Sequence, residues 1–291
     1  MTHHMTTPAL PTPAHVKVGN ATGELHFPYG TGTPWPGVVI LNSSAGVCDT
    51  RERFYARFLA ARGIAALVVD SFTSRGIGQT TADQSLFDDM DMERDAYAAH
   101  DLLAADPRIA LGNIAVMGVS KGGLAALNTA LLVRRHMFDR PRHDFSARVV
   151  IVPPAHLQHR DARTDGRPML MLLAGHDDYT GVAGPVEYAR RMIAAGNPGI
   201  KVRVHEGAHH AFERTGPPLY LPGAENFSHR LFMVEDDGSI TDEAGHHMGP
   251  QAFSASRRTY VVLGAHAGGG TDELKETVAT EILHFLVAAA R

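Results

Sequence analysis

A serine between glycines stands where a buried strand is expected to give way to a helix. Residues 118–122 read G-V-S-K-G, which matches the pattern G-x-S-x-G, and they follow the apolar run Ile114–Met117. Between a strand and a helix, this pattern places the serine in a tight turn that exposes its hydroxyl group. The flanking glycines leave room where the strand and the helix approach each other. The sequence therefore predicts that Ser120 is a nucleophile.

A nucleophilic serine that attacks a carbonyl group needs donors for the negative charge that develops on the carbonyl oxygen. We expect the backbone N–H of Lys121 to be one donor, because Lys121 directly follows the nucleophile at a helix N-terminus. The second donor is expected from the loop after the run Val38–Leu41, which reads N-S-S-A-G-V. Ser43 and Ser44 are both candidates, and the sequence does not choose between them.

Two adjacent aspartates, Asp177 and Asp178, follow the apolar run Met169–Leu173. In an open α/β sheet, ligand chemistry takes place just outside the carboxyl ends of the strands. A carboxylate there would hold a histidine in one tautomer and stabilise its protonated form. Only one of the two aspartates can face the histidine. We expect it to be Asp177, with Asp178 capping a helix or a turn.

A pair of histidines, His209 and His210, lies in the segment G-A-H-H-A-F after a further predicted strand. Histidine is the side chain whose pKa suits a general base near neutral pH. Both members of the pair are candidates, whereas His205 lies in the strand itself and is expected to be structural. The chain order serine, aspartate, histidine is typical of the α/β-hydrolase fold.

The rest of the chain predicts the scaffold that would hold these residues. Short apolar runs alternate with helical patterns, which predicts an α/β fold with a mostly parallel central sheet and helices on both faces. Together with the nucleophile motif and the order of the three residues, this pattern is typical of the α/β-hydrolase fold. The predicted strands are 38–41, 65–69, 114–117, 149–152 and 169–173, with an outer strand at 200–204 and an edge hairpin within 15–27. A capping box of Asp49 and Glu52 is expected to begin the first helix. The last helix is expected to start near Thr271.

We expect a single domain over residues 15–291, preceded by a loose, proline-containing arm at 1–14. Residues 213–270 interrupt the pattern with Gly- and Pro-rich turns and a hairpin-like turn at 235–238. This insertion is either a surface elaboration or a functional segment, such as a lid over the active site or a dimer contact. No metal is expected at His246 and His247, because no cysteine or carboxylate stands at zinc-ligand spacing from them.

The overall composition excludes several classes of function. The 291 residues are 44% hydrophobic and 20% charged, with a formal net charge of −4 and both signs mixed along the chain. They lack the basic stripe of a nucleic-acid-binding protein and any apolar run long enough to span a membrane. Cys48 is the single cysteine, which excludes an intrachain disulfide. The N-terminus has no apolar segment typical of a secretory signal, so we expect a cytoplasmic protein.

Several segments of the chain, between about Val38 and Phe212, resemble the dienelactone hydrolase family. They are N-S-S-A-G-V, the V-V-D-S-F-T-S-R-G stretch, G-V-S-K-G-G, and the pair G-H-D-D-Y-T with G-A-H-H-A-F. In family members the catalytic histidine directly precedes A-F, and the aspartate begins a segment that continues into an aromatic residue. The resemblance implies a Ser120–Asp177–His210 triad that needs no cofactor.

The sequence also departs from the family pattern. Members that open dienelactones typically have a cysteine nucleophile and a carboxylate in the oxyanion loop, where this chain has Ser120 and Ser43. We therefore expect a small-molecule ester, lactone or related acyl compound as substrate, rather than a dienelactone. Arg75, near a predicted strand end, has two interpretations. It either binds a substrate carboxylate in a bidentate pair or pairs with a loop carboxylate such as Asp70.

Three other interpretations stay open at this point. A serine peptidase or a carbon–carbon bond hydrolase on the same fold would carry the same residues. A non-catalytic binding protein would usually lack one of the three, and none is missing here. Several alanine- and glycine-rich helices offer faces for a homodimer, but none stands out.

Overall fold

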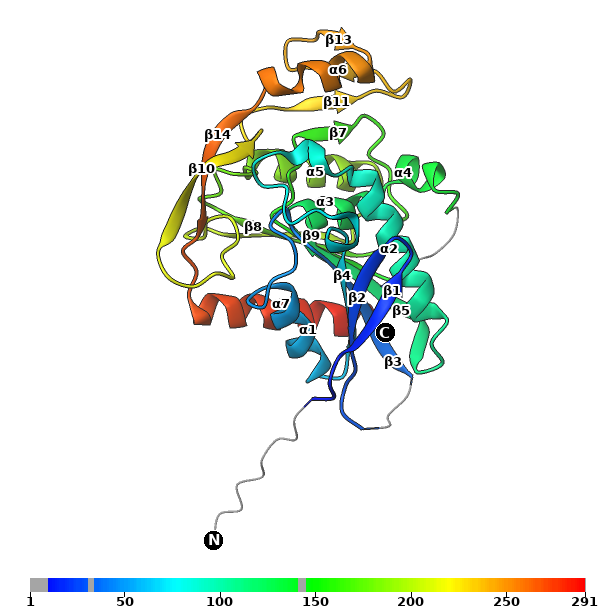
Figure 1. Ribbon diagram of the computed structural model, residues 1–291. Coiled ribbons are helices and arrows are strands. Elements are labelled where there is room, and N and C mark those ends of the chain that lie inside the picture. The colour runs from blue at the N-terminus through cyan, green and yellow to red at the C-terminus, as the bar shows by residue number, and fades with distance from the viewer. Residues whose placement is uncertain (1–9, 31–33, 141–144, 291) are drawn as a thin grey trace.

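The computed structural model describes residues 10–30, 34–140 and 145–290, and an eight-stranded sheet forms its centre (Figure 1). The strand order is β1-β2-β4-β3-β5-β6-β8-β9, and the six strands from β4 to β9 in that order are parallel. The strands are β1 (Ala14–Val18), β2 (Ala21–His26), β3 (Trp35–Leu41), β4 (Ala65–Asp70), β5 (Ile109–Val119), β6 (Arg148–Ile151), β8 (Met169–Ala174) and β9 (Ile200–His205). The predicted α/β class with a mostly parallel sheet is confirmed.

The edges of the sheet also follow the sequence pattern. β1 and β2 form the expected antiparallel hairpin, with β1 at one edge of the sheet. β9 lies at the other edge, where its alternation of apolar residues with Lys201 and Arg203 leaves one wetter face. Residues 1–9 of the expected N-terminal arm lie outside the described residues, and Ala14 already belongs to β1.

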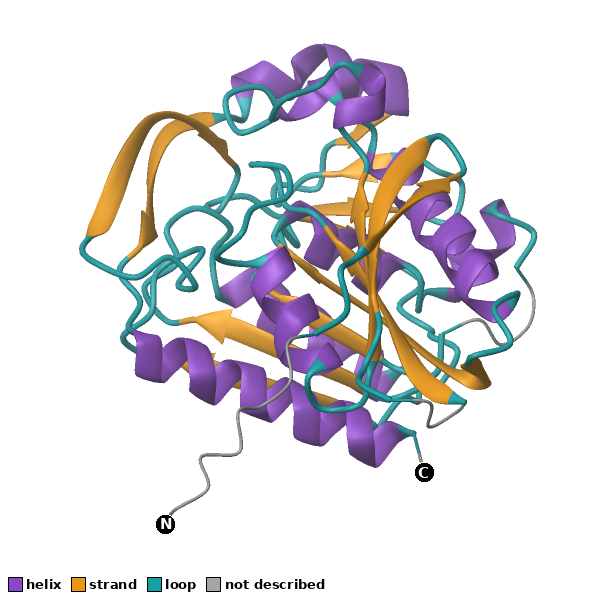
Figure 2. Ribbon diagram, turned by 60° about the horizontal axis from the view of Figure 1, so that its bottom comes forward, coloured by secondary structure: helices purple, strands orange, loops and turns teal. Residues whose placement is uncertain are grey.

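Helices cover both faces of the sheet (Figure 2). One apolar cluster joins the sheet to α2 (Asp89–Ala104), α3 (Lys121–Asn128) and α5 (Ala183–Ala194). A second cluster, on the opposite face, joins it to α1 (Glu52–Ala60) and α7 (Asp272–Ala289). The remaining short helices outside the insertion are α4 (Leu132–Met137), η1 (Thr73–Arg75) and η2 (Gln84–Leu86). The expected start of the last helix is confirmed, because Thr271 caps the N-terminus of α7 by accepting a hydrogen bond from the Leu274 N–H.

The insertion at 213–270 contains more regular structure than its sequence pattern indicated. β10 (Pro218–Asn226) and β14 (Val262–Gly268) form an antiparallel ribbon. β11 (Phe232–Val234), β12 (Ile240–Thr241) and β13 (His247–Met248) form a small sheet, in which the predicted turn at 235–238 joins β11 to β12. β11 also pairs with β7 (Leu157–His159), which precedes β8 in the chain. The insertion also contains α6 (Pro250–Ser256) and η3 (Arg257–Thr259). In Figure 1, α6 and the small sheet lie at the top of the molecule, and the β10–β14 ribbon runs down its left side.

Candidate active site

Ser120 occupies the sharp turn between β5 and α3. Its φ angle is 56°, in the left-handed region that non-glycine residues rarely adopt. The turn brings α3 so close to β3 that a Cβ atom on Gly122 would lie 2.6 Å from the carbonyl oxygen of Leu41. Such strain persists only where the surroundings enforce it, and it is frequent at active sites. The turn predicted from G-x-S-x-G is therefore present, with Ser120 at its tip.

His210 and Asp177 form a buried hydrogen-bonded pair. His210 Nδ1 and Asp177 Oδ2 are 2.9 Å apart, and the two residues are only 4% and 7% exposed. The other oxygen of Asp177 accepts hydrogen bonds from the backbone N–H groups of Tyr179 (2.9 Å) and Thr180 (2.8 Å). Because Asp177 is acceptor-only when ionised, His210 Nδ1 carries the proton, and Nε2 is left with a lone pair.

The surroundings of Asp177 favour its charged form. Burial alone would raise the pKa of its carboxyl group. The charge of His210 and its hydrogen bond outweigh burial, and the N–H and hydroxyl donors of Thr180 add to them, so the pKa of Asp177 is lowered. A carboxylate that stays ionised in a buried site stabilises a positive charge on the adjacent imidazole.

The neighbouring candidates, Asp178 and His209, point elsewhere. Asp178 Oδ2 lies 2.7 Å from Nδ1 of His266, and Oδ1 accepts the His266 backbone N–H at 2.8 Å. The His209 ring faces His176 and His266, with centroid distances of 5.4 Å and 6.0 Å. Of the two adjacent pairs, the structure thus brings together the members that we expected, Asp177 and His210.

Ser120 lines a cavity of about 340 Å³. The His210–Asp177 pair contacts two other residues of the cavity wall. Thr180 lines the cavity and donates its hydroxyl to Asp177 at 2.7 Å, and Tyr179 lines it with its ring 4.7 Å from that of His210. Within the described ranges, the Ser120 hydroxyl has no hydrogen-bond partner. In free enzymes, catalytic hydrogen bonds are often too long to form, and they shorten only when substrate binds.

The oxyanion loop distinguishes the two serine candidates. The Ser43 N–H donates to Glu52 Oε1 at 3.2 Å and is therefore engaged. Ser44 lines the cavity, and none of the described residues accepts a hydrogen bond from its N–H. Lys121 is the first residue of α3, so its N–H has no partner within the helix. Ser44 and Lys121 thus offer backbone donors near Ser120, whereas Ser43 does not.

Glu52 holds the oxyanion loop and does not form the expected capping box with Asp49. The α1 N-cap is Arg51, which makes no side-chain cap. Glu52 is fully buried and accepts hydrogen bonds from the N–H groups of Ser43 and Cys48, at 3.2 Å and 2.9 Å, and from Arg51 Nε at 2.8 Å. The capping prediction failed because these donors, and not the helix N-terminus, surround the carboxylate.

Arg75 is turned away from the cavity, which corrects the prediction that it binds a substrate carboxylate. Its guanidinium forms two hydrogen bonds with Asp95, at 2.8 Å and 2.9 Å, and a third with the Ser71 carbonyl at 2.7 Å. Arg75 is not among the residues that line the cavity. The alternative, a structural ion pair, describes this arginine, although its partner is Asp95 on α2 and not Asp70.

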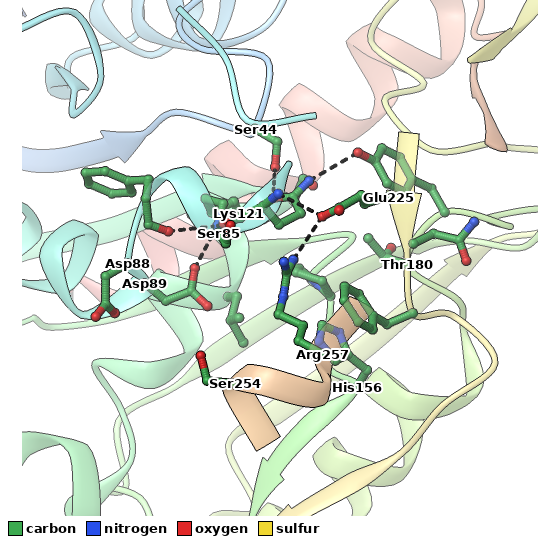
Figure 3. Close-up of a pocket in the computed structure, with 18 residues that line it drawn as sticks. Ser44, Ser85, Asp88, Asp89, Lys121, His156, Thr180, Glu225, Ser254 and Arg257 are labelled. Atoms are coloured by element: carbon green, nitrogen blue, oxygen red, sulfur yellow. Dashed lines mark hydrogen bonds and ion pairs between the residues drawn. The ribbon is translucent and has the colours of Figure 1, made fainter. Parts of the chain in front are cut away.

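The cavity contains charged residues that sequence reasoning missed (Figure 3). The Lys121 side chain reaches Asp89 Oδ1 at 2.9 Å and two backbone carbonyl groups, those of Phe87 and Gln84, at 3.4 Å and 3.5 Å. The insertion supplies part of the wall. Its lining residues are Glu225, Asn226, Phe227, Ser254 and Arg257.

Two further expectations concern metals and membranes. In the described part of the chain, no three His, Cys, Asp or Glu side chains converge on a point where they could hold a metal ion. His246 contacts Asp242 at 3.0 Å, and His247 contacts Thr241 at 3.1 Å. None of the described helices has the length and apolar character needed to cross a membrane.

Comparison with known proteins places the chain in a family. The family model described as "Dienelactone hydrolase family" matches residues 24–233. The chain belongs to the dienelactone hydrolase family. A metagenomic dienelactone hydrolase-like promiscuous phosphotriesterase is 20% identical, with a TM-score of 0.59 over 96% of this chain and 98% of its own. A thermophilic esterase of Thermogutta terrifontis is 16% identical, with a TM-score of 0.56 over 69% of this chain and 84% of its own. No curated protein sequence matches the chain.

The family assignment confirms the resemblance and identifies the chain as a hydrolase with the α/β-hydrolase fold. The matched segment of this dienelactone hydrolase family member contains Ser120, Asp177 and His210. It ends at residue 233, inside the insertion, so the cavity residues Ser254 and Arg257 lie beyond it. The part of the cavity that those two residues build is therefore not described by the family pattern.

Proposed function

We propose that this dienelactone hydrolase family member is a serine hydrolase that cleaves an ester, lactone or related acyl bond of a small molecule. The observation that carries the proposal is the buried 2.9 Å hydrogen bond between His210 and Asp177, next to the cavity that Ser120 lines. A serine in a strained turn, a histidine with its Nε2 lone pair available, and an ionised carboxylate are the parts that nucleophilic acyl transfer needs.

In the first half of the proposed reaction, His210 Nε2 takes the hydroxyl proton of Ser120 while Oγ attacks the substrate carbonyl carbon. The backbone N–H groups of Lys121 and Ser44 stabilise the negative charge on the carbonyl oxygen. His210 then gives its proton to the leaving alcohol oxygen as the carbon–oxygen bond breaks. An ester between Ser120 and the acyl group remains.

In the second half, His210 takes a proton from water as the water oxygen attacks the ester formed on Ser120. The tetrahedral intermediate collapses, the carboxylic acid leaves, and Ser120 regains its proton from His210. Asp177 keeps its charge throughout and stabilises the imidazolium in both halves. Every proton transfer is assigned to His210, so the scheme requires no cofactor.

The test is labelling with a fluorophosphonate probe, followed by mass mapping, on the native enzyme and on Ser120→Ala. We expect the probe on Ser120 in the native protein and no label in the variant. Native enzyme, labelled enzyme and Ser120→Ala are then assayed on p-nitrophenyl esters and small lactones. Only the unlabelled native enzyme should turn them over. A folded native protein that neither reacts with the probe nor turns over any of these substrates would contradict the proposal and favour a non-catalytic binding protein.

A further inference from the structure

Gln84 of η2 connects two sides of the cavity. Its amide oxygen, Oε1, accepts hydrogen bonds from Ser44 Oγ at 3.0 Å and from Thr80 Oγ1 at 3.3 Å. Its amide nitrogen, Nε2, donates to the Tyr179 hydroxyl at 3.3 Å. Ser44 is the proposed oxyanion donor, whereas the Tyr179 ring lies 4.7 Å from that of His210. One side chain thus joins the oxyanion loop to the neighbourhood of the proposed base.

The orientation of the Gln84 amide follows from Tyr179. The Tyr179 hydroxyl donates its single proton to the Thr81 carbonyl oxygen at 3.3 Å. Burial raises the pKa of Tyr179 to about 12, so that proton stays in place near neutral pH. The hydroxyl can therefore only accept from Gln84, which directs Nε2 toward Tyr179 and Oε1 toward Ser44. Ser44 must then be the donor in its hydrogen bond with Gln84, which fixes the direction of the Ser44 hydroxyl.

The backbone of Gln84 is fixed on two sides. Its N–H donates to Glu225 Oε2 at 2.9 Å, and its carbonyl oxygen accepts from Lys121 Nζ at 3.5 Å. Glu225 belongs to the insertion and also accepts a hydrogen bond from Arg257 at 3.1 Å. Ser44, Lys121 and Glu225 lie around one part of the cavity (Figure 3). The Gln84 side chain therefore extends from a backbone position that the insertion and α3 hold in place.

Ser44 is held on both sides of its N–H group. The Ser43 carbonyl oxygen, in the same peptide group, accepts from the Gly46 N–H at 3.0 Å, so the Ser44 N–H points the opposite way. The Ser44 carbonyl oxygen accepts from the Thr80 N–H at 2.7 Å. Among the described residues, only Gln84 forms a hydrogen bond with the Ser44 side chain. That contact is the one through which a side chain of the cavity wall fixes Ser44.

We propose that Gln84 is a positioning residue, which holds Ser44 so that the Ser44 N–H meets the negative charge that develops on the carbonyl oxygen. The inference rests on the proposed function, because it requires acyl transfer at Ser120. Gln84 acts through Ser44 and takes no part in the proton transfers of His210. Loss of a complete oxyanion donor lowers kcat by about 10²- to 10³-fold, and one hydrogen bond between neutral groups changes an equilibrium by up to about 10-fold. Because the Thr80 contact remains, loss of the Gln84 amide should lower kcat by about 10-fold.

The first test replaces the amide. Gln84→Met removes both amide groups and keeps the length of the side chain. We expect kcat on p-nitrophenyl butyrate to fall by about 10-fold and KM to change by less than about three-fold, because an oxyanion donor acts mainly on the transition state. Gln79→Met is the matched control. Gln79 lies earlier on the same segment, is exposed and has no side-chain hydrogen bond to any described residue, so kcat should stay at the native value.

A second substrate separates positioning from a general loss of structure. In the thionoester analogue of p-nitrophenyl butyrate, sulfur replaces the carbonyl oxygen, and sulfur accepts hydrogen bonds only weakly. The native enzyme should therefore have a much higher kcat/KM on the oxygen ester than on the thionoester. Gln84→Met should lower this ratio by about as much as it lowers kcat. A smaller fraction of folded enzyme would lower both values equally and leave the ratio unchanged.

A double-mutant cycle tests whether Gln84 acts through the Ser44 hydroxyl. Ser44→Ala removes that hydroxyl but keeps the backbone N–H, and it should lower the ratio of the two esters by about 10-fold. Adding Gln84→Met to Ser44→Ala should then change the ratio by less than about three-fold, because the two groups act as a unit. If Gln84→Met does not fold, Ser44→Ala alone carries the test.

Three outcomes overturn the inference. They are an unchanged ratio in folded Gln84→Met, an unchanged ratio in Ser44→Ala, and losses that multiply in the double variant. Each leaves the proposed function intact if the native enzyme turns over the oxygen ester and Ser120 is labelled. A native enzyme that shows neither turnover nor labelling contradicts the proposed function, and the inference with it.

Discussion

Replacing Glu52 with glutamine tests whether the first turn of α1 positions the oxyanion loop. The two carboxylate oxygens of Glu52 accept hydrogen bonds from the N–H groups of Ser43 and Cys48, which stand near the two ends of that loop. Ser44, the proposed oxyanion donor, lies between them. Arg51 adds a second connection, because its Nη2 donates to Ser43 Oγ at 2.6 Å and to the Gly46 carbonyl at 3.1 Å.

The expected losses of stability and kcat follow from the hydrogen-bonding groups that a glutamine side chain keeps. Its amide has nearly the same shape but only one oxygen, so an NH₂ group would face one of the N–H donors that Glu52 binds. The variant also removes the carboxylate that forms an ion pair with Arg51, which is 7% exposed. Removing one member of a buried ion pair typically costs about 3–5 kcal/mol of stability. If the Ser44 N–H shifts as well, the loss of one oxyanion donor lowers kcat by about 10²- to 10³-fold.

The assay is kcat and KM on p-nitrophenyl butyrate, together with the free energy of unfolding in urea. We expect kcat of Glu52→Gln to fall by about 10²-fold while KM changes by less than about three-fold, because the donor acts mainly on the transition state. Asp49→Asn is the matched control. That carboxylate is 75% exposed and contacts only arginines at the surface, so neither kcat nor stability should change appreciably.

One result would refute the reasoning. If Glu52→Gln is destabilised but keeps the native kcat below its unfolding temperature, the position of Ser44 does not depend on Glu52. The hydrogen bonds of Glu52 would then stabilise the fold without acting on the reaction.

Three further predictions follow from the site. Asp177→Asn should lower kcat by about 10⁴-fold, the effect of the same change in another serine hydrolase, whereas Asp178→Asn should keep near-native kcat. Gly122→Ala forces a Cβ atom to within 2.6 Å of a backbone oxygen and should cost about 1–3 kcal/mol of unfolding free energy, while Gly207→Ala, which meets nothing within 4 Å, should cost less than about 0.5 kcal/mol. The third concerns His156, because burial lowers its pKa to about 4 in the fold from 6.5 in its unperturbed state. The unfolded chain therefore binds more protons as pH falls from 6.5 to 4, and about 2 kcal/mol of stability should be lost across that window. Urea unfolding at pH 7 and pH 4.5 should show a smaller loss in His156→Phe, and an equal loss would contradict the assignment.

The parts of the fold that sequence predicted are those with short-range signals. A run such as Ile114–Met117 is apolar because both faces of its strand are buried, and the glycines around Ser120 are required by backbone contacts within a few residues. The choice of Asp177 and His210 also came from local patterns, through the family resemblance. Such features depend on neighbours in the chain, and a single sequence records them directly.

The features that could not be predicted depend on contacts between distant segments. Arg75 looked free to bind substrate because its partner, Asp95, lies 20 residues further along the chain on α2. β7 is only three residues long and pairs with β11, 75 residues away, so neither strand has a pattern that stands out alone. The spacing of Asp49 and Glu52 matches that of a capping box. It therefore gave no indication that Glu52 accepts a hydrogen bond from Ser43 instead.

The proposed catalytic residues and part of the cavity wall lie in two different parts of the chain. The proposed nucleophile, base and acid lie in the segment that the family model matches, and they are held by the sheet and its helices. The cavity wall also draws on residues 225–257, which extend beyond that match. The insertion also contacts the proposed base, because the Gly268 N–H donates a hydrogen bond to the His210 carbonyl oxygen at 2.7 Å. Substitutions at the insertion residues that line the cavity should therefore change substrate preference, whereas substitutions near Gly268 should also affect the chemistry through His210.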